Sequence, residues 1–324
     1  MWKQVLPLDP VAYRRHLIHS RDRQWAETNC YVDVWVELLH AWGFDPVAVL
    51  PVTLAIDFEG DQWTFFKVPH ADLTDLYGLD VQELAIWKPL VEHIEEQVGL
   101  GRPVLVEMDS YHLPDTAGTA YGTEHVKSTI AVTAIDREAR ALRYFHNQGF
   151  YEVAGNDFDR LFHLTGPTDA ARLPPYVEFV KRRPGPAPTG DELTRTSLRL
   201  LRRQMGLPPA SNPFERFRDR LAADLGWLSA ESLDTFHKYS FATLRQFGAA
   251  YELAATYLRW LAARTGKPLE ATADGFATIS SAAKSLQFHL ARAVARKKPL
   301  DLAPIDSMAA RWRVAMDELR ARDP

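Results

Sequence analysis

The chain has 324 residues, of which 46% are hydrophobic, and it contains a single cysteine. This length exceeds what one hydrophobic core ordinarily serves, so two domains are expected. A lone cysteine excludes an internal disulfide and a thiolate metal cluster.

The sequence shows neither a basic-then-apolar leader nor an apolar run of the roughly 18–20 residues that cross a bilayer. We therefore expect a cytoplasmic protein without a membrane partner. The formal net charge of −4 is unevenly distributed, since residues 190–324 contain 21 Lys and Arg against 15 Asp and Glu. This split favours an acidic partner for the second half and is too weak to indicate nucleic acid.

The first half of the chain mixes helix and strand signals. Asn29 is a helix-capping residue type, and apolar residues recur at helical spacing from Cys30 to about Trp42, before a stop at Gly43. Strands are expected over 47–50 and 52–58, then a hairpin to 63–66, a helix over 81–98, and strands over 103–109, 126–135 and 141–145.

A run rich in Pro and Gly interrupts these patterns, because proline fixes φ and removes a backbone donor. Strand signals then vanish, and helices are expected over 191–205, 213–225, 230–264, 269–298 and 305–322. The sequence therefore predicts an α+β domain over 1–181, a linker over 182–190 and an all-helical domain over 191–324.

Cys30 lies in the first turn of its expected helix, where free N–H groups and the helix dipole favour a thiolate. A cysteine nucleophile needs a base and a group that orients the base. His125 opens the strand over 126–135 and Asn147 follows the returning strand, so the hairpin is expected to bring them together. Gln24 is a candidate oxyanion donor beside the Cys30 N–H. The alternative for Cys30 is packing, since free cysteine is often buried.

Asp109, Tyr111 and His112 lie where a strand ends in a loop, which is where site residues gather, so they are candidate substrate contacts. An ordinary turn is the alternative. Trp63 lies in an aromatic-rich hairpin and is a further candidate contact, with a half-buried hairpin as the alternative.

Two other features carry weaker signals. A metal site drawn from His112, Asp115, Glu124 and His125 lacks the short histidine spacings of zinc sites, so neither a metal nor another cofactor is expected. Four cations lie near the end of the helix over 269–298, either as a solvated helix end or as a dock for an acidic carrier protein. They are Arg292, Arg296, Lys297 and Lys298.

The order of Gln24, Cys30, His125 and Asn147 resembles the papain-like cysteine-peptidase fold, in which a helix packs on an antiparallel sheet. Three stretches also resemble the N-terminal domain of BtrH-type acyltransferases. They are Gly101-Arg102-Pro103-Val104, Asp109-Ser110-Tyr111-His112-Leu113-Pro114 and Glu124-His125. That pattern places an aspartate where this chain has His146-Asn147, so the third triad member stays open between these two residues.

The stretches 28–33 and 57–67 resemble the uncharacterised bacterial family DUF1839, whose members tend to sit beside amino-acid:carrier-protein ligases and carrier proteins. The resemblance implies an (amino)acyl thioester on a phosphopantetheine arm as substrate. We therefore expect an acyltransferase that passes the acyl group through Cys30 to an amine or hydroxyl. The alternatives are a papain-like peptidase or amidohydrolase and a non-catalytic carrier-binding module. The acyl group, the acceptor and the oligomeric state stay open.

Overall fold

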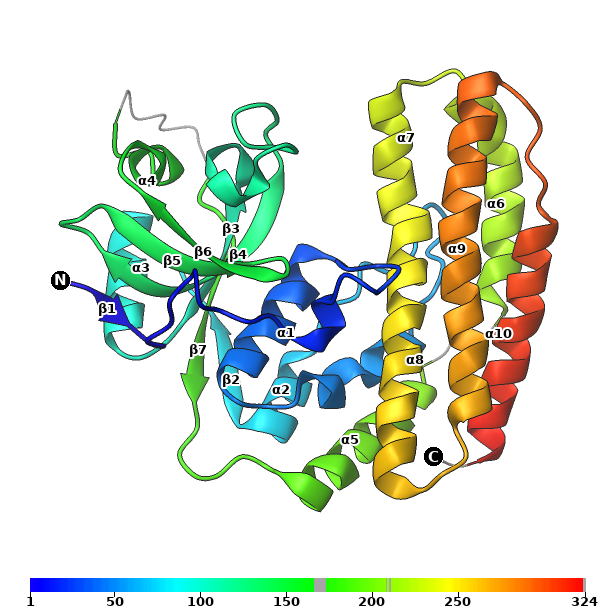
Figure 1. The fold of residues 1–324 in the computed structure, drawn as a ribbon, viewed down its shortest axis with the longest axis horizontal. Helices are drawn as coiled ribbons and strands as arrows, with labels where there is room; N and C mark the ends of the chain where they lie inside the picture. Colours follow the sequence, from blue (N-terminus) through cyan, green and yellow to red (C-terminus); the bar gives the residue numbers. More distant parts are fainter. Residues whose placement is uncertain (166–172, 208, 210, 323–324) are drawn as a thin grey trace. The chain divides into compact units, whose positions relative to one another are not determined.

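The computed structural model describes residues 1–165, 173–207, 209 and 211–322. The chain divides into two compact units, and each is described by itself. The first unit comprises Met1–Ser20, Asn29–Pro46 and Leu73–Ala187. The second comprises Arg21–Thr28, Val47–Asp72 and Pro188–Pro324, so it takes two segments from the first half of the sequence. The expected α+β class is confirmed, with a sheet and helices in one unit and helices in the other (Figure 1).

The first unit is built on a seven-stranded antiparallel sheet with the order β2-β7-β3-β4-β5-β6, and β1 pairs with β4. Its strands are β1 Lys3–Gln4, β2 Leu79–Glu83, β3 Val104–Asp109, β4 Lys127–Asp136, β5 Ala141–His146, β6 Gly149–Ala154 and β7 Val177–Arg182. Two short helices, α3 (Leu90–Gly99) and α4 (Asn156–Leu161), accompany it.

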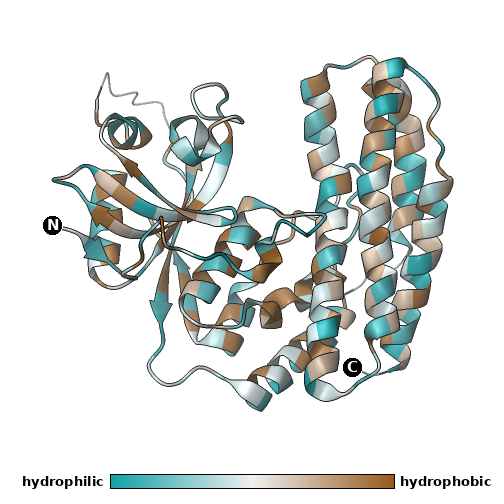
Figure 2. Cartoon of the chain, viewed as in Figure 1, coloured by the Kyte–Doolittle hydropathy of each residue, from teal (hydrophilic) through white to brown (hydrophobic). Residues whose placement is uncertain are grey.

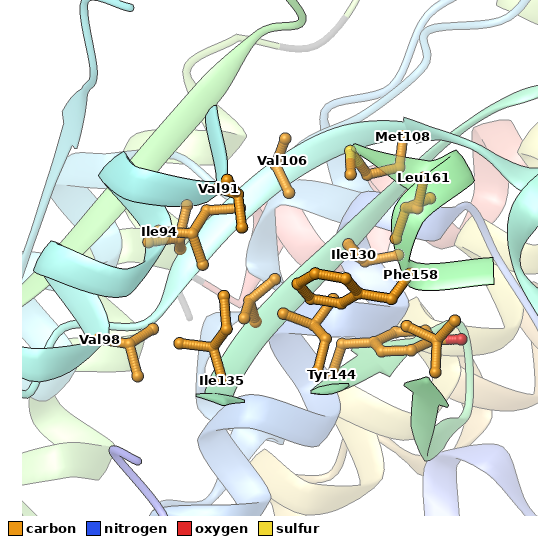
Figure 3. Close-up of a cluster of buried hydrophobic side chains, with 14 of the residues drawn as sticks. Val91, Ile94, Val98, Val106, Met108, Ile130, Ile135, Tyr144, Phe158 and Leu161 are labelled. Carbon is orange, nitrogen blue, oxygen red and sulfur yellow. The ribbon is translucent and has the colours of Figure 1, made fainter. Parts of the chain in front are cut away.

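One face of the sheet carries the core that α3 and α4 cover (Figure 3). Because side chains alternate along a strand, every second residue of β3, namely Val104, Val106 and Met108, points into this core. Ile130 and Tyr144 do so from β4 and β5. The intervening residues of each strand therefore face the opposite side.

Helix α1 (Cys30–Ala41) packs on that opposite side, against β4 and β5. The side chain of Asn29 accepts a hydrogen bond of 3.0 Å from the Val32 N–H, which caps the helix as the sequence predicted. Tyr31 donates 2.9 Å to the Glu178 carboxylate of β7. Since Glu178 pairs with Leu105, both lie on the face opposite the α3 core, which fixes where the first turn of α1 sits.

The middle of α1 buries two carboxylates. Asp33 and Glu37 are one helical turn apart, and both are fully buried. Nδ1 of His19 contacts Glu37, and its Nε2 lies 3.3 Å from Asp33 Oδ1. The Tyr13 hydroxyl donates to the second Glu37 oxygen at 2.5 Å. Burial lowers the pKa of His19, but the hydrogen bonds to Asp33 and Glu37 outweigh it and raise that pKa to about 9.

The second unit is mainly helical, and the segment Val47–Asp72 that it takes from the first half contains most of a 3-10 helix. Its helices are α5 Gly190–Met205, α6 Pro213–Leu228, α7 Leu233–Ser240, the π-helix η5 Phe241–Arg245, α8 Gln246–Thr265, α9 Glu270–Arg296 and α10 Ala303–Ala321. The helices carry hydrophobic and hydrophilic residues side by side, as amphipathic helices do (Figure 2). Trp63 is completely buried among their aromatic side chains, with ring centroids 4.8 Å from Phe247 and 4.9 Å from Phe214.

Several predicted elements are wrong in type. Strands were expected over 47–50 and 52–58, but Pro46–Leu54 forms a 3-10 helix (η2), because an apolar run without alternation fits a strand and a buried helix equally. The expected hairpin is reduced to one bridge between Phe58 and Trp63. The helix expected over 81–98 is split into β2 and α3 at Pro89, since a proline disfavours helix in the residue before it.

Other elements were missed or drawn too long. Strands β6 and β7 had no predicted counterpart. The helix expected over 230–264 starts later, at Leu233, where the Ser232 side chain caps the N–H of Thr235. Among the described residues, no helix has both the length and the apolar content to cross a membrane.

The His19 cluster predicts a pH dependence of stability. A pKa raised from 6.5 to about 9 on folding contributes stability that is complete below pH 6.5 and is lost as the pH rises through 9. We expect the free energy of unfolding to fall by about 3 kcal/mol across this window in urea titrations. His16 acts elsewhere, because burial and His40 lower its pKa to about 4, so its effect lies below pH 6.5. An equally steep fall in the variant His19→Gln would contradict this assignment.

Candidate active site

A histidine and an aspartate meet where β3 ends. Nδ1 of His125 lies 2.6 Å from Oδ2 of Asp109. The Tyr111 ring stacks on the His125 ring with centroids 4.3 Å apart and planes within 6°. The backbone N–H of Tyr111 donates 3.0 Å to the other Asp109 oxygen. The imidazole is thus held both through Nδ1 and across its face, which leaves Nε2 as the nitrogen for chemistry.

The local sequence explains this meeting. Asp109 is the last residue of β3 and pairs with Lys127, the first residue of β4. A short 3-10 turn, η3 (Ser110–His112), follows, and the Ser110 N–H donates 2.9 Å to the Val126 carbonyl. The loop between β3 and β4 therefore returns directly beside its own start and brings His125 onto Asp109.

The pair has the electrostatics of an oriented imidazole. Burial raises the pKa of Asp109, but the hydrogen bonds from His125 and from the Tyr111 N–H outweigh this and lower it. Asp109 therefore stays ionised and can stabilise a positive His125. The His125 side chain is 71% exposed and that of Asp109 is 23% exposed, so a ligand can reach the ring.

A surface pocket of about 260 Å³ adjoins the pair. Its wall includes an ion pair of 2.7 Å between Lys127 and Glu107. The pocket is lined by Glu107, Met108, Asp109, His125, Val126, Lys127 and Pro175. It has an apolar side and both signs of charge, which suits a polar organic ligand.

Cys30 starts α1 on the same face of the sheet and is half-buried. Below the first turn of α1, Glu178 accepts from Tyr31 at 2.9 Å and from Tyr176 at 2.8 Å. Glu178 pairs with Leu105, and Asp109 lies four residues further along β3, about 13 Å away along the strand. Cys30 is not among the described residues that line the His125 pocket.

The two residues considered as third triad member lie elsewhere. His146 pairs with Ile130 and so points into the α3 core, on the face opposite Asp109. There it lies 2.6 Å from both Asp115 and Ser128. Asn147 follows in the β5–β6 turn with a φ of 46°, a left-handed conformation that asparagine tolerates. The residue that hydrogen-bonds to His125 is instead Asp109, which the sequence suggested only as a substrate contact.

Two further candidates belong to the second unit. The Gln24 amide donates 2.9 Å to the Ser281 hydroxyl on α9, and its backbone N–H donates to Glu252 on α8. Trp63 is buried in the aromatic core described above. Gln24 as oxyanion donor and Trp63 as substrate contact stay predictions.

His112 lies beside the pair, with its ring centroid 5.0 Å from that of Tyr111 and 6.4 Å from that of His125. Burial lowers the pKa of His112, which favours the neutral ring. Within the described ranges, no group of three or more His, Cys, Asp or Glu is arranged to hold a metal ion.

The sequence signal for this pair is that Asp109 ends one expected strand and His125 comes just before the next, but only the strand register brings their side chains together. Asp109 pairs with Lys127, and His125 lies two residues earlier in the chain. Glu178 and Tyr176 had no such signal, because β7 was not predicted and its pairing with β3 spans more than 70 residues.

The comparisons with known proteins concern the whole chain. The model of the DUF1839 N-terminal domain matches residues 14–182, and the model of the DUF1839 C-terminal domain matches residues 190–321. No protein of curated function matches the sequence. Since the two matches together span most of its length, the chain belongs to the DUF1839 family.

Proposed function

We propose that the protein is a cysteine-dependent acyltransferase. The observation that carries the proposal is the oriented, accessible His125–Asp109 pair on the sheet face over which α1 begins at Cys30. An imidazole with its Nδ1 bound to a carboxylate is the usual base of a cysteine or serine acyl-transfer site.

In the proposed reaction, the Cys30 thiol gives its proton to Nε2 of His125, and its sulfur attacks a thioester carbonyl. The bond between the carbonyl carbon and the donor sulfur breaks, and the donor thiolate takes up the proton. An amine or hydroxyl acceptor then attacks the acyl-Cys30 thioester, loses its proton to His125, and the Cys30 sulfur leaves. Backbone N–H groups in the first turn of α1 are the proposed oxyanion donors, with Gln24 as a further candidate.

The proposed donor is an (amino)acyl group on the phosphopantetheine arm of a carrier protein. A thioester suits a cysteine nucleophile, because exchange of one thiol for another is nearly balanced in free energy and the donor thiol leaves readily. We place the protein in the cytoplasm, where a single thiol stays reduced.

The second candidate is a binding module without catalysis. The observation that favours it is that the pocket beside His125 is lined without Cys30. In that case the pocket would hold part of a ligand or partner, and Cys30 would only pack at the start of α1.

Incubation with an aminoacyl thioester of a carrier protein tests the leading proposal through intact-protein mass. We expect wild type to gain the acyl mass, Cys30→Ala to gain none, and His125→Ala to be acylated on the order of 10²-fold more slowly, since it lacks the base. His237→Ala removes an exposed histidine of the second unit and serves as the control. If wild type binds the donor and remains unmodified across a panel of acyl groups, the binding module replaces the enzyme.

The same assay can distinguish which of Asp109 and Asn147 orients His125. Asp109→Asn removes the carboxylate that stabilises a positive His125, so we expect acylation to slow on the order of 10²-fold or more. Asn147→Gly introduces a residue that also adopts the left-handed conformation of this turn. We expect its acylation rate to lie within about threefold of the wild-type rate. The reverse ranking of the two variants would restore Asn147 as the orienting residue.

A further inference from the structure

The C-terminal end of α9 carries a group of cations without carboxylate partners. Arg292, Arg296, Lys297 and Lys298 are all exposed, and none of them forms an ion pair with any residue that the structure describes. Other arginines of the second unit are paired, as Arg218 is with Asp306 at 2.7 Å and Arg259 with Asp274 at 2.7 Å. Among the described residues, the end of α9 therefore gathers four cations without ion pairs in one place.

Three of these cations, Arg292, Arg296 and Lys298, line a pocket of about 310 Å³. It is lined by His289, Arg292, Ala293, Arg296, Lys298, Pro299, Leu300, Asp301 and Pro304. Asp301 is the one carboxylate among these lining residues, and its Oδ1 accepts a hydrogen bond of 3.0 Å from the Ala303 N–H at the start of α10. Phe288 is 62% exposed and lies one turn before Arg292 on α9. Cationic side chains, an apolar floor and an exposed aromatic ring thus occur together.

The helix dipole explains only part of this arrangement. Cations are favoured in the last turn of a helix, which accounts for Arg296 and its successors. Arg292 lies a full turn earlier. Lys297 adopts a left-handed conformation with a φ of 50°, where glycine is the usual residue at a helix end. A lysine at that position brings a charge to the surface at a cost in backbone energy.

We propose that the cationic end of α9 is a docking surface for an acidic protein segment that presents several carboxylates beside an apolar side chain. Arg292 and Arg296 lie about 6 Å apart along the helix, and Lys297 and Lys298 continue the row of cations at its end, so several carboxylates can be met in sequence. Arginine next to an aromatic residue is typical of protein interfaces. Nucleic acid and anionic membranes fit less well, because the whole chain has a net charge of −4. This proposal does not depend on catalysis by Cys30.

Fluorescence anisotropy with the full chain tests the proposal. The probe is a labelled amphipathic helical peptide with Asp and Glu on one face and Leu on the other, compared with its scrambled, equally charged sequence. We expect the amphipathic peptide to bind at least tenfold more tightly than the scrambled one, and its affinity to fall with salt. Arg292→Glu/Arg296→Glu should weaken binding at least tenfold.

Two variants separate docking from folding and from bulk charge. Arg195→Glu/Arg311→Glu reverses two other exposed arginines of the same unit, so it changes the net charge by the same amount as the α9 double variant. Its affinity for the peptide should lie within twofold of the wild-type affinity. Lys297→Gly relieves the left-handed residue, so it should keep or raise the melting temperature and still weaken binding. Cys30→Ala should bind as wild type does, which separates this result from the acylation assay.

Several outcomes overturn the proposal. It is wrong if the amphipathic peptide does not bind, if the scrambled peptide binds as tightly, or if both double charge reversals weaken binding equally. It is also wrong if a short DNA duplex, anionic vesicles or inorganic phosphate at millimolar concentration displaces the peptide by binding to Arg292 and Arg296.

Discussion

The position of α1 depends on the pairing of its two buried carboxylates with His19. A buried charge that loses its partner is strongly destabilising, so Asp33 and Glu37 can be buried against the sheet only where the His19 imidazole meets both. The Tyr31–Glu178 hydrogen bond then holds the first turn of the helix over β7. These contacts fix the position of Cys30, although Cys30 itself takes part in none of them.

Two His–Asp pairs include a residue of a described sheet strand, one pair on each face, and their surroundings differ. His146 and Asp115 are 1% and 5% exposed and are hydrogen-bonded within the α3 core, together with Tyr144. Such a buried, satisfied network stabilises and specifies a core. His125 and Asp109 instead lie at an open strand end beside a pocket, where a ligand can approach. The second pair is therefore the one of the two that a ligand can reach.

The chain reaches Cys30 through a segment that packs with the helices of the second unit. Glu252 of α8 accepts hydrogen bonds from the backbone N–H groups of Gln24 and Trp25, at 3.1 and 3.0 Å. Gly248 of α8 is needed there, because a Cβ at that position would lie 2.5 Å from the Trp25 ring. The boundary between the units in this part of the chain falls between Thr28 and Asn29, directly before the helix cap.

The sequence by itself determined the elements whose signals are local. The cap at Asn29, the helix from Cys30 and the strands β3, β4 and β5 followed from residue type and periodicity, because these depend on neighbours within a few residues. The meeting of His125 with Asp109, the opposite face of His146 and the burial of Trp63 were decided only by the tertiary structure. Strand register and long-range packing set all three, and a one-residue change of register would turn each strand side chain to the other face.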